Sequence, residues 1–215
     1  MRGSAARAGA AAGIAGPAAF TGAWIVSSVR QTGYPAAEIQ ISGLAAPDAR
    51  DPWIMIAGFL VLGGCSVAFG TALRRALGGR ARAGAAPWLI QGAGLATIAA
   101  GLLRRDHMLL TSGSVSWHNH AHDVISAAIY VDLVAAQLLL AARFGRDPCE
   151  AGGLDWQPWR PWLLASAGVT AAVLVAFAAD TSAADAGILQ RVAVTIPLAA
   201  IAAVAARLVR TPASG

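Results

Sequence analysis

The sequence contains no lysine and has little charge of either sign. Charged residues make up 13% of its 215 residues, well below the roughly 25% that is typical of soluble domains. Hydrophobic residues make up 57%. A water-soluble globule with this composition would lack enough charge to cover its surface. The composition therefore predicts an integral membrane protein.

Cysteine is also scarce. Cys65 falls within an apolar segment, and Cys149 falls in a connection that we expect to face the reducing cytoplasm. Because the two thiols are expected at different depths, no disulfide is predicted. A glycine motif for phosphate binding is missing as well, since the stretch GGRARAG at 78–84 does not match GxxxxGK[ST].

Long apolar segments are what the sequence has in abundance. Each is close to the length that crosses a hydrocarbon core of roughly 30 Å. Pro87 and Pro161 are expected in first helical turns, where the missing N–H costs nothing. The six predicted spans are residues 10–29, 53–73, 87–103, 124–142, 161–179 and 188–206. The fold prediction is an all-α bundle of six transmembrane helices, with residues 1–215 as a single transmembrane domain.

Arginine is distributed unevenly among the connections between these spans. It predominates in both termini and in the second and fourth connections, whereas the other three connections and their flanking residues together hold five arginines against seven acidic residues. Positive charge in short loops tends to stay in the cytoplasm, so both termini are predicted to be cytoplasmic and the protein to be in the plasma membrane. The first apolar stretch is long for a signal peptide, which favours a retained helix. No arginine stripe with interleaved aromatic residues is present, so no nucleic-acid partner is predicted.

All four histidines fall between the third predicted span and the start of the fourth. They are His107, His118, His120 and His122. His118 and His122 share a helix face if the fourth helix begins early enough, and Ser126 follows on the same stripe. This spacing suits a divalent metal, with Asp106 or Asp123 as a carboxylate ligand. The sequence contains no HExxH pattern. A structural or pH-sensitive role for the histidines at the edge of the bundle is therefore favoured over metal binding and over metal-free acid–base catalysis.

Asp132 is expected near the middle of the fourth span. Such carboxylates are costly in lipid and usually face the bundle interior, where they pair or line a wet cavity. Helical geometry places Asp132 about 40° from His118 and about 80° from His122, so the three side chains could follow one side of the helix inward. Gln91 and Gln137 are candidate neutral partners. A functional carboxylate and a protonated packing residue both fit this pattern.

Several motifs occur in an order that resembles a known family. They are ISGLAAPDARDPWIMIAGFLVLG (41–63), Asp106 after the third span, HDVISAAIYV (122–131) and LQRVAV (189–194). Together they resemble the small bacterial membrane proteins grouped as domain of unknown function 998. The resemblance implies a six-helix membrane bundle and no known activity. The family's aromatic-Pro-x-Asp turn is here residues 103–106, Leu-Arg-Arg-Asp, a departure that puts a role carried over for this turn in doubt.

The positions that match the family motifs are Ser42, Asp106, His122 and Arg191. The predicted topology places all four at the outer surface, which suggests one extracytoplasmic polar cup. An ion pair between Asp106 and Arg191 would fix His122 between them, as a structural clasp or as a binding site. Arg105, Ser42 and Arg191 are the candidate ligand-binding residues. The candidate catalytic residues are His122, Asp106 and Asp132.

Three kinds of function remain open. The favoured prediction is a non-enzymatic accessory or lipid-binding protein, because no span carries paired acids, a nucleophile with its base or a cofactor fingerprint. In this prediction, Asp132 binds a proton or stabilises a partner helix. The partner helix would belong to another membrane protein or to a second copy of this chain. The alternative is a membrane enzyme in which His122 acts on a lipid whose phosphate Arg191 holds. The third is pH sensing by the histidines. No inverted repeat is visible between the two halves of the sequence, which argues against a transporter.

Overall fold

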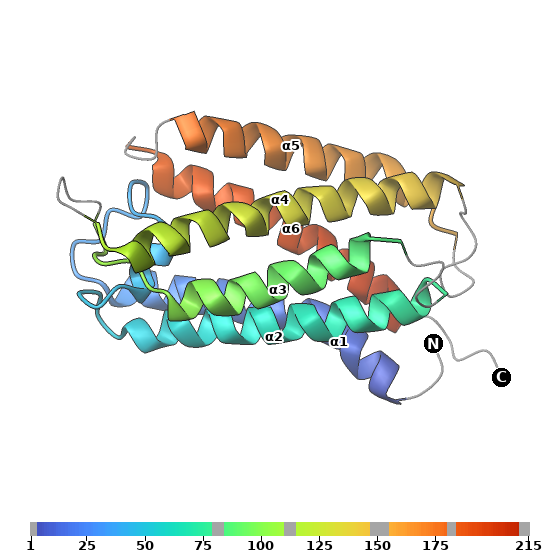
Figure 1. The fold of residues 1–215 in the computed structure, drawn as a ribbon, viewed down its shortest axis with the longest axis horizontal. Helices are drawn as coiled ribbons and strands as arrows, with labels where there is room; N and C mark the ends of the chain where they lie inside the picture. The colour runs from blue at the N-terminus through green and yellow to red at the C-terminus, as the bar shows by residue number, and fades with distance from the viewer. Residues whose placement is uncertain (1–3, 79–83, 110–114, 147–154, 180–183, 211–215) are drawn as a thin grey trace.

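The computed structural model describes residues 4–78, 84–109, 115–146, 155–179 and 184–210. Within these ranges the chain is helical and contains no β-strand. Its long helices run side by side along one axis (Figure 1). The elements are α1 (Ser4–Arg30), the short 3-10 helix η1 (Ile41–Ala45), α2 (Pro52–Ala76), α3 (Ala86–Leu102), α4 (Trp117–Arg146), α5 (Trp159–Ala179) and α6 (Ala186–Val209).

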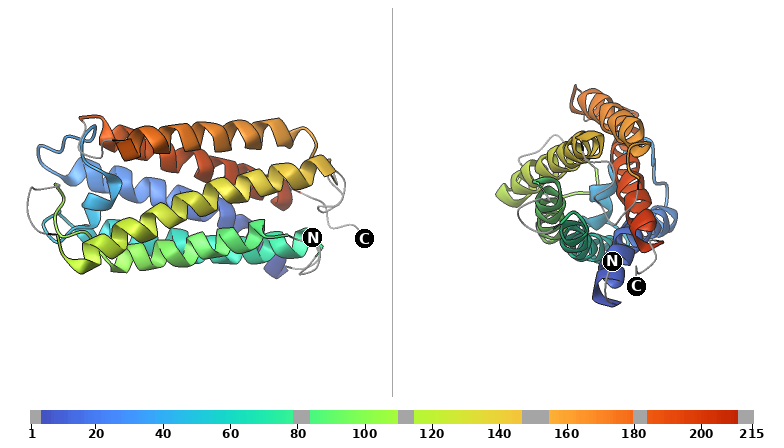
Figure 2. Two further views of the ribbon diagram at one scale, coloured as in Figure 1. Left: turned by 45° about the horizontal axis from the view of Figure 1, so that its top comes forward. Right: turned by 90° about the vertical axis from the view of Figure 1, so that its right-hand side faces the viewer.

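The helices form a ring in chain order. Each packs against the next, and α6 packs against α1 to close the ring (Figure 2). The η1 segment contacts α1, α2 and α6 at one end of the bundle, and all five of its residues are buried. The connection that follows α1 therefore returns into the bundle.

The all-helical prediction is confirmed, and each predicted span corresponds to one helix. Within the described ranges, five helices are long and apolar enough to cross a membrane, whereas α3 is a shorter apolar helix of 17 residues. Most helices extend a few residues beyond the predicted spans. The largest difference is in α4, which begins at Trp117 and not at residue 124.

The two ends of the bundle differ in their charged residues. The arginine-rich end holds the start of α1, the ends of α2, α4 and α6, and the starts of α3 and α5. Its described arginines are Arg7, Arg74, Arg75, Arg143, Arg146, Arg160, Arg207 and Arg210. Asp155 is the single acidic residue that the described ranges hold there. The opposite, histidine-rich end holds residues 31–51, 103–109 and 115–122.

Aromatic and aliphatic side chains fill the space enclosed by the six helices. Trp156, just before α5, is fully buried. Its ring stacks on Phe144 with centroids 4.6 Å apart, since the chain before α5 folds back over the end of α4. Cys65 is a free thiol in α2, and Cys149 lies outside the described residues.

Glycines bring the backbones of α2 and α3 together. A Cβ added at Gly63 would lie 2.5 Å from the carbonyl oxygen of Gly94, and one added at Gly94 would lie 2.7 Å from that of Gly63. Because the opposing atoms belong to the backbone, a side chain at either position would force the helices apart. Small residues permit close helix packing in lipid in this way.

We expect Gly63→Ala to destabilise the bundle, because overpacking a contact of this kind costs about 1–3 kcal/mol. Gly64→Ala is the matched control, since no atom beyond the adjacent turns of its own helix lies within 4 Å of a Cβ added there and alanine is the better helix former. Thermal unfolding of both variants in detergent measures the difference. A Gly63→Ala melting temperature equal to or above that of Gly64→Ala would contradict the prediction.

Candidate functional site

Arg191, in the second turn of α6, holds the connection after α1 in place. Its Nη1 donates hydrogen bonds to the carbonyl oxygens of Ala36 (2.8 Å), Ile39 (2.9 Å) and Gly187 (2.8 Å). Its Nη2 donates to the hydroxyl of Tyr34 at 2.7 Å. The guanidinium therefore satisfies backbone oxygens of a folded connection and does not face a carboxylate.

The start of α6 is shaped to receive this connection. A Cβ added at Gly187 would lie 2.6 Å from the carbonyl oxygens of Ala36 and Ile39, so only glycine allows the contact. One residue later, the backbone N–H of Ile188 donates to the carbonyl of Ala37 at 3.0 Å. Residues 34–41 thus lie directly against α6.

The side chain of Gln190 completes this attachment. Its Oε1 accepts the backbone N–H of Ile41 at 2.6 Å, at the point where η1 begins. The attachment brings Ser42, the next residue, into the buried interior of the bundle.

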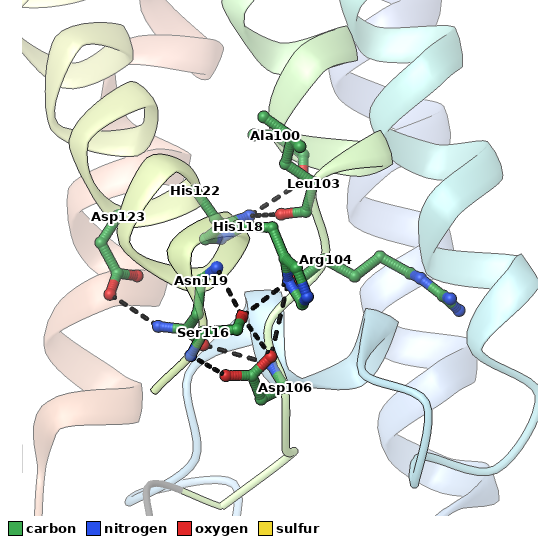
Figure 3. Close-up of polar contacts among 9 residues, drawn as sticks. All are labelled: Ala100, Leu103, Arg104, Asp106, Ser116, His118, Asn119, His122 and Asp123. Carbon is green, nitrogen blue, oxygen red and sulfur yellow. Dashed lines mark hydrogen bonds and ion pairs between the residues drawn. The ribbon is translucent and has the colours of Figure 1, made fainter. Parts of the chain in front are cut away.

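Asp106 caps the start of α4 (Figure 3). Its carboxylate accepts the backbone N–H of Ser116 at 2.7 Å and the Ser116 hydroxyl at 2.6 Å. The Ser116 oxygen in turn accepts the backbone N–H of Asn119 at 3.2 Å, the usual N-cap contact. Asn119 also accepts the N–H of Asp106 and donates to Asp123. This network explains why α4 begins before the apolar stretch.

These neighbours favour the charged form of Asp106. The hydroxyl of Ser116, and then its backbone N–H, hold the pKa of Asp106 below its ordinary value of 3.8. His118 Nδ1 lies 3.4 Å from the same carboxylate. The predicted ion pair between Asp106 and Arg191 is wrong, because each group satisfies other partners and no salt bridge joins them in the described part of the chain. Asp106 acts as a clasp between the two sides of its connection.

His122 is buried one turn beyond this network, with 2% of its surface exposed. Its Nδ1 lies 2.9 Å from the carbonyl oxygens of both Ala100 and Leu103 at the end of α3 (Figure 3). Because carbonyl oxygens only accept hydrogen bonds, Nδ1 carries the proton, and in the neutral ring Nε2 keeps a lone pair. The imidazole therefore satisfies terminal carbonyls of α3 and leaves Nε2 as an acceptor.

His118 shares the helix face of His122, as the spacing predicted, but has different partners. Its Nδ1 lies 2.9 Å from the Ser116 oxygen and 3.4 Å from the carbonyl oxygen of Arg104. Within the described ranges, no three His, Cys, Asp or Glu side chains form a group that could hold a metal ion. A metal held by His118 and His122 stays a prediction.

A cavity of about 380 Å³, which we call the His122 cavity, lies between η1, α4, α5 and α6. Two of the four family-motif residues, Ser42 and His122, line it, while Asp106 and Arg191 do not. Its polar lining residues are Gln40, Ser42, His122, Asp123, Ser126, Tyr130 and Gln190. Its apolar wall includes Val131, Leu174 and Phe177. The structure thus brings together half of the expected cup.

A smaller cavity of about 50 Å³, the central cavity, continues from the His122 cavity into the bundle. The residues that line both are Ser42, Ser126, Tyr130 and Gln190. The remaining lining is mostly apolar and includes Phe20, Phe59, Leu62 and Leu198. Polar groups near His122 therefore give way to an apolar interior.

Arg105 lies behind the wall of the His122 cavity. It is 3% exposed, and its Nη1 donates to Oε1 of Gln40, a lining residue, at 2.8 Å. Burial lowers the pKa of Arg105, and the charges of Asp123 and Asp106 oppose this shift. The predicted ligand-binding role of Arg105 would therefore act through Gln40.

Asp132 faces α3 and does not line the His122 cavity. A Cβ added at Gly92 of α3 would lie 3.3 Å from Asp132 Oδ2. The two candidate partners are engaged elsewhere: Gln91 donates to a threonine of α2, and Gln137 accepts from a serine of α5. His118, His122 and Asp132 therefore all lie on the side of α4 that faces α3 and the residues after it, but of the three only His122 lines the His122 cavity.

Three hydrogen-bonding residues of the cavity wall were not predicted from the sequence: Gln40, Tyr130 and Gln190. Gln190 had a usable signal, since it is an amide beside Arg191 within a motif that opens an apolar span. Gln40 had none, because its place in the wall depends on how residues 34–41 fold against α6.

We expect Ser116→Ala to destabilise the protein by about 0.5–2 kcal/mol near neutral pH, the usual loss for an N-cap. A carboxylate with a lowered pKa stabilises the fold above its unfolded pKa and loses this effect as the pH falls through its folded pKa. The difference from wild type should therefore shrink below pH 3.8, the ordinary pKa of Asp106. Melting temperatures from pH 7 to pH 3 measure it. Ser116→Thr, which keeps the hydroxyl, is the control, and a difference that does not depend on pH would contradict the prediction.

Comparison with known proteins gives one match. The model of a family described as "Protein of unknown function (DUF998)" matches residues 14–207. No curated protein and no solved structure matches the chain. The family match covers most of the chain, including Ser42, Asp106, His122 and Arg191, which carried the resemblance seen in the sequence. The chain belongs to the DUF998 family.

Proposed function

We propose that the protein binds an amphipathic, lipid-like molecule in the His122 cavity, with a hydroxyl or other proton-donating headgroup at Nε2 of His122. One observation carries this proposal: backbone carbonyls hold the His122 ring through Nδ1 while the ring lines a cavity. A ring oriented in this way presents a hydrogen-bond acceptor of fixed position to the cavity.

The size and polarity of the cavity support an amphipathic ligand. Small-molecule sites commonly have volumes of about 300–1,000 Å³ and combine an apolar lining with a few polar groups. The His122 cavity has about 380 Å³ and places its amides, hydroxyls and imidazole near the histidine-rich end. The apolar central cavity continues from it. A headgroup would lie beside His122, and a chain would extend along α5 or into the bundle.

The charges in the wall favour a donor over an anion. Asp123 is the only charged side chain in the described lining, and it is acidic. Arg191, which the sequence suggested as a phosphate ligand, donates instead to the carbonyls of Ala36, Ile39 and Gly187. An alcohol or an amine would meet acceptors here, whereas a phosphate would meet a carboxylate.

We expect His122→Asn to fold and to bind a long-chain alcohol more weakly. The asparagine amide nitrogen replaces Nδ1 as donor to the carbonyls of Ala100 and Leu103, but nothing replaces Nε2. Loss of one hydrogen bond is worth about 0.5–1.5 kcal/mol, which weakens affinity about two- to tenfold. Thermal-shift titration with dodecanol in detergent measures the affinity, since a ligand of the native state raises the melting temperature.

His120→Ala is the matched control, because His120 is an exposed histidine of the same helical turn. It should bind dodecanol as wild type does. Dodecyl phosphate tests the headgroup and should bind more weakly than dodecanol. Unchanged dodecanol binding by His122→Asn, or preference for dodecyl phosphate, would contradict the proposal.

The same geometry supports a second candidate, an enzyme that acts on a hydroxyl-bearing lipid. A lone pair on Nε2 can accept the proton of a hydroxyl, as a general base does. Asp106 and Arg191 do not line the cavity with His122, so its neighbours there would be Asp123 and Ser126. The variant pair above separates the candidates. If the protein is an enzyme, membranes that contain the wild type should hold lipids of altered mass, and membranes that contain His122→Asn should not. Identical lipid masses in the two membranes would support binding without catalysis.

We also propose that all six helices cross the plasma membrane with both termini in the cytoplasm. The segregation of arginine to the end where α1 begins and α6 ends supports this orientation. A green fluorescent protein fused after Gly215 should fluoresce, and alkaline phosphatase fused there should be inactive. Active phosphatase would place this terminus outside and reverse the orientation.

A further inference from the structure

A third cavity, of about 370 Å³, lies at the arginine-rich end between the start of α5 and the last turns of α6. Its lining residues are Trp159, Ala203, Ala206, Arg207 and Arg210. It shares no residue with the His122 cavity at the other end of the bundle. Its ligand can therefore be considered independently of the proposed function.

Aromatic rings fix the position of Arg207 in this cavity. Its guanidinium carbon lies 5.2 Å from the ring centroid of Trp156 and 5.3 Å from that of Trp159. Its Nη2 also donates to the carbonyl oxygen of Asp155 at 2.5 Å. A guanidinium held in this way loses little conformational freedom when it binds a further group.

Arg210 adds a second positive charge on the same side of α6. The two arginines are three residues apart, which makes them neighbours on a helix surface. Arg210 is exposed, and its side chain forms no hydrogen bond or ion pair with the residues that the structure describes. The positive end of the α5 dipole lies at the same place, because α5 begins at Trp159.

We infer that this cavity binds the phosphate diester of an anionic phospholipid. Guanidinium groups form strong charge-assisted hydrogen bonds with phosphate oxygens. Ala203 and Ala206 form an apolar floor on which the glycerol and the first acyl carbons can lie. Trp159 and the neighbouring Trp162 occupy the helix end, where tryptophan favours the headgroup region. Basic pockets between helices at a cytoplasmic surface bind anionic headgroups through the same combination.

A second basic groove distinguishes a specific site from general attraction to positive charge. Arg143 and Arg146 at the end of α4 line a cavity with Gly84 and Leu139, and its described lining contains no aromatic ring. If charge alone attracted anionic lipid, both grooves would contribute equally. The tryptophan-held arginine predicts tighter binding at the α5–α6 cavity.

The experiment is native mass spectrometry of the full chain released from detergent, titrated with phosphatidylglycerol, phosphatidylcholine or inorganic phosphate. Wild type should retain phosphatidylglycerol in preference to phosphatidylcholine. Arg210→Gln should weaken phosphatidylglycerol binding about fivefold, the effect of one basic residue near a membrane surface. Arg146→Gln, in the other groove, and Arg50→Gln, at the other end, remove the same charge and should have smaller effects.

Three results would overturn the inference. Equal retention of the two lipids would remove the requirement for an anion, and equal losses in Arg146→Gln and Arg210→Gln would indicate general attraction. Full competition by millimolar inorganic phosphate would show that the acyl chains contribute nothing, which would make free phosphate the ligand. An unchanged melting temperature of Arg210→Gln shows that a loss of binding does not come from unfolding.

Discussion

The hydrogen bonds of Arg191 keep the histidine-rich end of the bundle closed. A guanidinium presents donors in a rigid fork, and here they meet three backbone carbonyls and a tyrosine hydroxyl. These contacts hold residues 34–41 against α6, and η1 follows them into the bundle. Ser42 and Gln40 line the His122 cavity because of this attachment. Without it, the cavity would lose one wall.

The four family-motif residues divide into two roles. Asp106 and Arg191 each hold a connection against a helix and are satisfied by nearby groups. Ser42 and His122 line the cavity, and His122 also satisfies the last carbonyls of α3. The polar cluster is thus a structural clasp around a small cavity. A substitution at Asp106 or Arg191 would alter the cavity indirectly, through the position of its walls.

The helices were predictable from the sequence because lipid solvation demands long apolar segments, which composition reveals directly. The residue at which α4 begins was not predictable, since it depends on a hydrogen bond between Asp106 and Ser116 across the connection that precedes the helix. The Asp106–Arg191 ion pair was predicted because opposite charges were expected on one surface. The actual partners of Arg191 are mostly backbone carbonyls, which every residue possesses and which therefore leave no sequence signal. His122 was found because all four histidines fall in one short stretch and because it matches a family motif, although its tautomer required the structure.

The shortness of α3 has a consequence for the surrounding bilayer. Seventeen residues of helix rise only about 25 Å, less than the roughly 30 Å of a typical hydrocarbon core, whereas the 30 residues of α4 rise about 45 Å. In the arrangement proposed above, with all six helices across the membrane, lipids beside α3 must compress, or Arg104 must extend its side chain outward toward the phosphates. Because His122 lies against the end of α3, such thinning would bring water and headgroups closer to its imidazole than they come beside the other helices.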